Sequence, residues 1–187
     1  DGRYHPMLID ATLVESDGTR LGHGFVLGDA LDAPMVVNLM QGRAVSVRER
    51  DGRGGESEKW MQVHFEKGDS YLRHFHADYG FDAVALLKDF AQLVGKVELA
   101  DRQLLDELKK GNQVALIAGA PFHKQLLIEA DPSTKQLAIR SETGELLSMR
   151  ALAEQKIGHD RETRNEMGQA LGDGLQKVRT VENGLGL

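Results

Sequence analysis

Short stretches of apolar and β-branched residues, bounded by turn residues, recur along this chain and predict β-strands. Residues 7–14 and 19–27 form the first pair, and Glu15-Ser16-Asp17-Gly18 between them carries an Asp-Gly turn. Asp131-Pro132-Ser133-Thr134 fits a type I turn between two later strands. The remaining strands are predicted at 43–49, 59–66, 71–77, 112–118, 124–130 and 136–141.

Apolar residues at helical spacing predict helices between these strands. The clearest is 82–94, where Asp82 is placed to cap the first turn and the apolar positions repeat every three or four residues. A shorter helix follows Asp32, with Pro34 in its first turn and Gly42 after its end. A third helix is predicted from its capping residue Asp101 to Gly111.

The second half of the chain repeats the plan of the first. The segment Leu39-Met40-Gln41-Gly42-Arg43-Ala44-Val45 matches Leu108-Lys109-Lys110-Gly111-Asn112-Gln113-Val114, and Asp32 matches Asp101, at an offset of 69 residues in both comparisons. Because helix–glycine–strand junctions are common, chance similarity is the alternative. The order of a helix and three strands in both halves favours duplication.

We therefore predict an α+β fold of two tandem helix-plus-antiparallel-sheet units with an N-terminal hairpin. The predicted parts are a hairpin over 1–30 packed on the first unit, a first unit over 31–95, a second unit over 96–148, and a helical or partly disordered tail over 149–187. In the tail, apolar residues at 157, 167, 171, 175 and 178 have helical spacing, but glycines at 168, 172 and 174 weaken the helix.

Composition narrows the class of protein. The 187 residues include no cysteine, which excludes disulfides, thiolate zinc sites and cysteine nucleophiles and fits a cytoplasmic protein. No apolar run reaches the length of a transmembrane helix, so no membrane partner is expected. The net charge of −6 opposes non-specific binding to nucleic acid. The chain begins at Asp1 rather than Met, as a piece of a longer protein would.

One segment carries a family resemblance. It consists of Leu99-Ala100-Asp101-Arg102-Gln103-Leu104-Leu105-Asp106-Glu107-Leu108-Lys109-Lys110-Gly111-Asn112-Gln113-Val114, then Leu127-Ile128-Glu129-Ala130-Asp131 and Lys135-Gln136-Leu137-Ala138-Ile139. It resembles a family of unknown function whose members occur as tandem repeats in proteins of bacterial conjugative plasmids and integrative elements. The first half of the chain shares the pattern only loosely. The resemblance implies a mobile-DNA context and a multidomain parent protein, and it implies no reaction.

A candidate metal site lies in the segment 68–78. Residues two apart on a strand share a face, so His74, His76 and Asp78 are expected to align, and His64 can join from the neighbouring strand. Imidazoles with a carboxylate are ligands for zinc, iron or manganese. The spacing of Gly68, His74 and His76 is similar to the first metal motif of cupin barrels, but the glutamate of that motif is absent. The alternative is a pair of half-exposed histidines at a strand edge.

A candidate nucleic-acid surface is the 43–59 hairpin with its glycine-rich tip. A two-stranded ribbon can enter a DNA groove or follow phosphates. Neighbouring carboxylates offset its charge, so a solvated loop is the alternative. The residues expected to contact nucleic acid are Arg43, Arg48, Arg50, Arg53, Lys59 and the single stacking ring Trp60.

No nucleophile elbow, phosphate-binding loop or dinucleotide fingerprint appears in the sequence, and no cofactor is expected. The sequence favours a non-catalytic interaction or assembly module from a bacterial mobile-element protein, with a protein partner that binds a sheet edge or the tail. The alternatives are a nucleic-acid-binding accessory domain and a metal-dependent enzyme centred on His74 and His76. The oligomeric state stays open.

Overall fold

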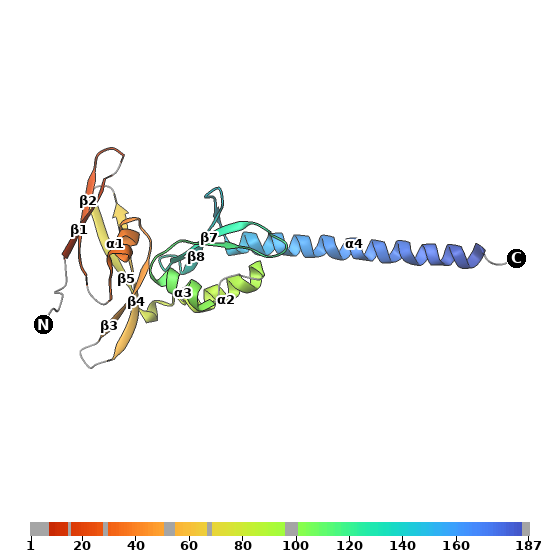
Figure 1. The fold of residues 1–187 in the computed structure, drawn as a ribbon, viewed down its shortest axis with the longest axis horizontal. Coiled ribbons are helices and arrows are strands. Elements are labelled where there is room, and N and C mark those ends of the chain that lie inside the picture. Colours follow the sequence, from red (N-terminus) through yellow and green to blue (C-terminus); the bar gives the residue numbers. More distant parts are fainter. Residues whose placement is uncertain are drawn as a thin grey trace.

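The structure of the chain, a computed structural model, describes residues 8–14, 16–27, 30–50, 55–66, 69–95 and 101–184. Within these ranges it confirms the expected α+β class, with antiparallel sheets and helices arranged as two tandem units behind an N-terminal hairpin (Figure 1). Hairpin and first unit lie at one end, the second unit follows, and a long helix extends from it (Figure 1).

The first unit places a helix and a hairpin on one face of a three-stranded sheet. Sheet order is β3-β4-β5, both pairings are antiparallel, and the hairpin β1-β2 forms a separate sheet. Met35, Val36 and Leu39 of the helix pack with Phe25 of the hairpin and Val63 of the sheet in one core cluster. The elements are β1 (Leu8–Val14), β2 (Arg20–Val26), α1 (Ala33–Met40), β3 (Val45–Arg50), β4 (Glu56–Glu66) and β5 (Asp69–Phe75).

The second unit is a four-stranded antiparallel sheet covered by helices on one face. Leu126, Ile128 and Ile139 of this sheet pack against Phe90 and Leu108 of two helices, and all five side chains are fully buried. The opposite face of the sheet is not covered by these helices. The elements are the short 3₁₀ helix η1 (Ala77–Tyr79), α2 (Ala83–Val94), α3 (Asp101–Lys109), β6 (Val114–Ile117), β7 (Gln125–Asp131), β8 (Gln136–Ser141) and β9 (Leu146–Leu147).

Helix α2 packs in a different unit from the one to which the sequence assigned it. Its residues fall within the expected first unit, 31–95, but its buried side chains Leu87, Phe90 and Val94 belong to the core of the second unit. The helix is amphipathic in either position, so its periodicity identifies the buried stripe but not the sheet that covers it. The second sheet is therefore covered by α2 as well as by α3.

A small third cluster joins the two units. Trp60 and Phe75 of the first sheet pack with Ala83 of α2 and Ala130 of β7. Trp60 also meets the ring of Phe81 edge-on, with ring centroids 5.2 Å apart. Because these side chains are apolar and are buried or, for Phe81, partly buried, this contact stabilises one arrangement of the two sheets.

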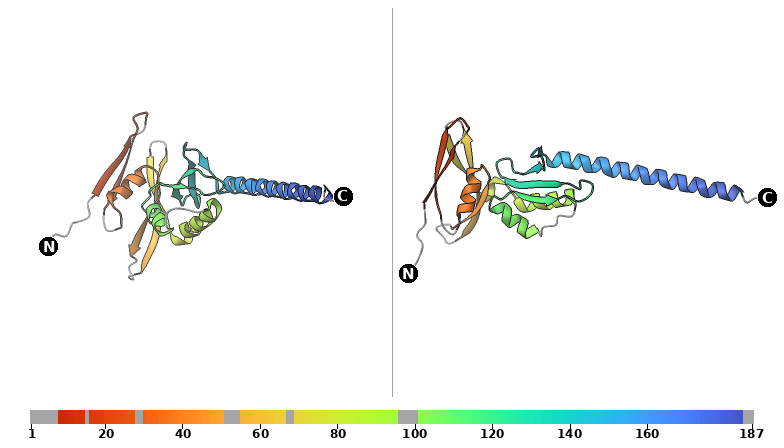
Figure 2. Two further views of the ribbon diagram at one scale, coloured as in Figure 1. Left: turned by 45° about the vertical axis from the view of Figure 1, so that its right-hand side comes forward. Right: turned by 45° about the horizontal axis from the view of Figure 1, so that its top comes forward.

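The described side chains that anchor the last helix, α4 (Met149–Gly184), lie at its beginning. Leu152 is buried in the core of the second unit, and the Lys156 ammonium donates to the Gln92 carbonyl oxygen at 3.1 Å. Beyond these turns the helix extends away from the rest of the chain in every view (Figure 2). No helix in the described part of the chain combines the length and the apolar character that a bilayer crossing requires.

Candidate functional site

The helices α1 and α3 end in the same way. Gly42 and Gly111 follow them with φ of +77° and +80°, in the left-handed region that glycine adopts without strain. In the first unit the Arg43 N–H donates to the Asn38 carbonyl at 3.0 Å, and in the second the Asn112 N–H donates to the Glu107 carbonyl at 3.0 Å. This is the hydrogen bond of a glycine-terminated helix cap, repeated at the expected offset.

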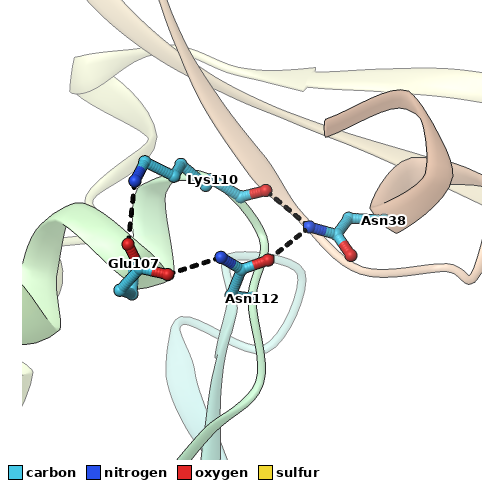
Figure 3. Close-up of polar contacts among 4 residues, drawn as sticks. All are labelled: Asn38, Glu107, Lys110 and Asn112. Carbon is cyan, nitrogen blue, oxygen red and sulfur yellow. Dashed lines mark hydrogen bonds and ion pairs between the residues drawn. The ribbon is translucent and has the colours of Figure 1, made fainter. Parts of the chain in front are cut away.

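The two caps contact each other through Asn38 (Figure 3). Its side-chain amide donates to the Lys110 carbonyl at 2.8 Å and to the Asn112 side-chain oxygen at 2.9 Å. The Asn112 amide in turn donates to the Glu107 carboxylate, which also pairs with the Lys110 ammonium at 2.8 Å. Asn38 is the one buried polar side chain among the described residues. Buried amides are costly unless bonded, so this network favours one orientation of the units.

The Glu107 carboxylate gives this network a pH dependence. Hydrogen bonds from Lys110 and then from Asn112 hold its pKa below the usual value. The ionised Glu107 carboxylate therefore contributes fully to stability above about pH 4.3, the ordinary glutamate pKa. This contribution is lost as the pH falls through the lower folded-state pKa of Glu107. Because the Glu107 side chain is 43% exposed, we expect a loss below about 1 kcal/mol.

Urea unfolding of the protein and of Glu107→Gln from pH 7 to pH 3 measures this effect. The stability difference between the two proteins should shrink as the solution becomes acidic. Glu162→Gln makes the same charge change on exposed α4 and should leave the pH profile parallel to that of the unchanged protein. A Glu107→Gln profile that also stays parallel would show that the carboxylate adds nothing to the junction.

A polar cleft of about 540 Å³ lies beside this junction, between the two units. The cap of α1 and strand β4 form one wall, and the face of the second sheet that points away from α2 and α3 forms the other. Both walls carry charged side chains and amides, and the lining includes Arg43, Gln62, Glu129, Asp131 and Arg140. Arg140 approaches Glu129 at 3.8 Å, a long distance for an ion pair, so both groups keep bonding capacity.

Two buried polar atoms of β4, one of them on the cleft-lining residue Gln62, have no hydrogen-bond partner among the described residues. They are Gln62 Oε1 and His64 Nε2, which lie on the same face of β4. The other end of the Gln62 amide donates to the Gly42 carbonyl at 2.9 Å. Burial, and next the Arg73 charge, lower the pKa of His64, which favours its neutral form. An unpartnered buried polar atom costs about 1–3 kcal/mol, so a ligand that supplies the missing bond gains affinity.

The described residues that were expected to bind nucleic acid lie in different surroundings. Trp60 is 7% exposed within the contact between the units, so its ring is not accessible to a base. Lys59 pairs with Glu49 at 2.7 Å, and the Arg43 guanidinium donates to the Gly111 carbonyl and to Gln41. These local bonds occupy the cationic groups of Lys59 and Arg43, which phosphate binding would require.

The remaining basic residues of the hairpin are only partly described by the structure. Arg48 is exposed on β3, near the Glu58 carboxylate. Arg50 lies at the end of β3, and its side chain is outside what the structure describes. Arg53 and the loop tip 51–54 lie outside the described residues. A nucleic-acid surface on this hairpin stays a prediction.

The residues expected to bind a metal lie apart. In the β4–β5 pairing His64 is opposite Tyr71 and His74 is opposite Met61, so the two imidazoles occupy opposite faces of the sheet. The expectation that His74, His76 and Asp78 align on one strand is wrong, because β5 ends at Phe75. His76 directly precedes η1, without a capping bond from its side chain, and Asp78 lies inside η1.

Local and packing interactions end the strand at this point. Phe75 is buried between the units, the Tyr79 N–H donates to the His76 carbonyl at 2.9 Å, and Gly80 leaves the turn with φ +86°. Within the described ranges no group of three or more histidine and carboxylate side chains is placed to hold a metal ion.

Sequence reasoning missed the junction and the cleft. Asn38 sits in α1 among apolar residues, and nothing local distinguishes it from an exposed polar position. The one available signal was the aligned pair of helix–glycine ends, because duplicated units pack against each other. The cleft residues come from four separate strands, the cap of α1 and the turn before β6, so they share no motif.

Fold and site together define an α+β protein of two tandem helix–sheet units with a polar cleft between them and a projecting C-terminal helix. Comparison with known proteins assigns no family, because no family model, no curated protein and no solved structure matches the chain.

Proposed function

We propose that this chain is an assembly module whose helix α4 associates with the α4 of a second copy. The observation that carries the proposal is the length of α4 that nothing else in the described chain supports. Glycines at 158, 168, 172 and 174 each cost up to about 1 kcal/mol, and most helices owe their stability to packing of one face. A partner surface supplies that packing.

The spacing of apolar residues in α4 supports another helix as the partner. Counted in sevens from Ile157, Leu171 and Val178 occupy the same heptad position, a. Met167 and Val181 occupy position d of the same heptad, three residues after an a position. Ile157 and Met167 are both more than half exposed in the single chain. Five of the eight core positions of this heptad from 157 to 181 are apolar, the others being Asp160, Arg164 and Gly174, so the row is a partial coiled-coil seam in which each helix covers the apolar positions of the other.

Charge supports a second copy as the source of that helix. Residues 149–184 contain six basic and six acidic side chains, so α4 is neutral, whereas the remainder carries the whole net charge of −6. Two copies can therefore meet along α4 without net repulsion. A role in conjugation, which the resemblance of residues 99–140 implies, remains a prediction, as does the cytoplasmic location.

Sedimentation velocity from micromolar to near-millimolar protein tests the proposal. We expect the intact chain to associate as its concentration rises, and Met167→Glu combined with Leu171→Glu to abolish this association by placing charges in the seam. Gln169→Glu adds one charge at the outermost heptad position and should associate like the unchanged chain. A single monomeric species at the highest concentration, or equal behaviour of the seam and control variants, would refute self-assembly through α4.

A further inference from the structure

The cleft between the two units continues into a second hollow on the outer face of the second sheet. The second hollow has a volume of about 440 Å³. Asp131, Ala138 and Leu146 line both hollows, so they form one groove across β7, β8 and β9. Half of the residues that line the continuation are aliphatic, among them Leu146, which is 62% exposed, and Leu147, and the exposed surface of this hollow is mostly apolar. The groove therefore has a polar end between the units and an apolar end beside the start of α4.

Amide side chains give the polar end both donors and acceptors. Gln41, Gln62 and Gln113 line it from both walls. Gln62 keeps one oxygen without a partner among the described residues, and Gln113 is exposed. Each amide presents a carbonyl and an NH₂ group, which match the N–H and C=O groups of an extended peptide. A phosphate backbone offers acceptors only, so it leaves the glutamine carbonyl oxygens unused.

The charges of the polar end are balanced. Arg43 and Arg140 face Glu129 and Asp131 in one lining, so the site has no net charge. None of the described residues gives Arg43 a carboxylate partner, and the one ion pair of Glu129 within the described part of the chain is the long contact to Arg140. A polyanion meets two carboxylates here and a polycation meets two guanidinium groups. A ligand that carries one charge of each sign satisfies both pairs.

We propose that this groove binds an extended peptide segment in which oppositely charged residues lie next to an aliphatic residue. The charged side chains contact Arg43 and Glu129, the peptide backbone bonds to the glutamine amides, and the aliphatic side chain packs on Leu146. The open, polar shape suits a chain segment better than a small molecule, because small-molecule pockets are mostly apolar and enclose their ligand. This site is separate from the α4 seam and does not depend on self-assembly.

Amide chemical-shift titration of the full chain, at a concentration where it is monomeric, tests the proposal. The probes are four acetylated and amidated pentapeptides with one leucine and two variable positions. The variable positions hold lysine with glutamate, two lysines, two glutamates, or two glutamines. We expect the lysine–glutamate peptide to bind most tightly and to shift signals around Gln62, Gln113 and Leu146.

Variants assign the binding to the groove. Glu129→Gln with Arg140→Gln removes one charge of each sign and should weaken binding of the lysine–glutamate peptide about tenfold. The matched control, Arg150→Gln with Glu154→Gln, removes the exposed ion pair on α4, whose groups meet at 2.9 Å outside the groove, and should leave binding unchanged. Both double variants keep the net charge of the chain, so general electrostatic effects on peptide binding cancel in the comparison.

Three results would overturn the proposal. One is the absence of groove shifts with every peptide at millimolar concentration. Another is equal binding of the four peptides, which would show that the charges select nothing. The third is stronger, steeply salt-dependent binding of a single-stranded oligonucleotide at the same residues, which would make the groove a nucleic-acid site. Each of these results leaves the α4 assembly proposal intact, because that proposal is read from sedimentation.

Discussion

Replacing Gly111 by alanine is expected to lower the free energy of unfolding by about 2–5 kcal/mol. Gly111 has φ +80°, where an added Cβ is strained. The Cβ would also lie 2.8 Å from Val45 Cγ1, 2.9 Å from Asn38 Cβ and 3.0 Å from the Ala44 carbonyl oxygen. All three atoms belong to the first unit, so the methyl group would separate the units at their junction. Urea unfolding monitored by Trp60 fluorescence measures the loss.

Gly42 is the matched control for this change. It occupies the equivalent helix end with φ +77°, but the nearest atom to an added Cβ, Phe65 Cε2, is 4.0 Å away. Gly42→Ala therefore carries only the backbone strain, about 1–2 kcal/mol. The excess cost at Gly111 measures the close approach of the units. Equal costs for the two substitutions would show that the junction is not tightly packed.

Leu152→Ala is expected to cost about 2–5 kcal/mol, the range of leucine deletions in well-packed cores. Leu152 is 1% exposed and packs with the core of the second unit, where it anchors the beginning of α4. Its removal leaves a cavity between α4 and that core, so both the stability of the unit and the anchoring of the helix decrease. Thermal and urea unfolding of the variant measure the change.

Ile157→Ala on the same helix serves as the control. Ile157 lies five residues further along and is 54% exposed, so in the monomer its truncation should change stability by less than about 0.5 kcal/mol. Above the association concentration the same substitution should weaken assembly, because Ile157 belongs to the proposed seam. A large cost in the dilute monomer would contradict the exposed position of Ile157 and the projection of α4.

Features that depend on a few neighbouring residues were predictable from the sequence. Asp32 and Asp82 accept hydrogen bonds from the N–H groups of Met35 and Ala85 at 2.9 and 3.0 Å, as expected of helix-capping residues. Strand β8 has the predicted limits, and the hydroxyls of Ser133 and Thr134 donate to Asp131 in the predicted turn. The capping role expected of Asp101 lies outside the described side chains.

Strand ends and faces were harder to predict, and this changed the candidate sites. The alternation of apolar and polar residues predicted a strand over 71–77. In the structure η1 begins at residue 77, because Phe75 is buried and Gly80 permits a tight turn. The same alternation could not show that His64 and His74 lie on opposite faces, since that depends on the pairing of β4 with β5. Trp60 was expected to be a stacking ring, but it packs between the units.

The sequence by itself determined the class of the fold, the helix caps, the turns and the duplicated helix–glycine–strand plan. All of these arise from hydrogen bonds and backbone preferences within a few residues. Only the tertiary structure decided that α2 covers the second sheet, that Asn38 meets Lys110 and Asn112 across more than seventy residues of chain, and that a polar groove opens between the units. These features depend on the packing of surfaces that are distant in sequence, and local residue patterns do not indicate which surfaces meet.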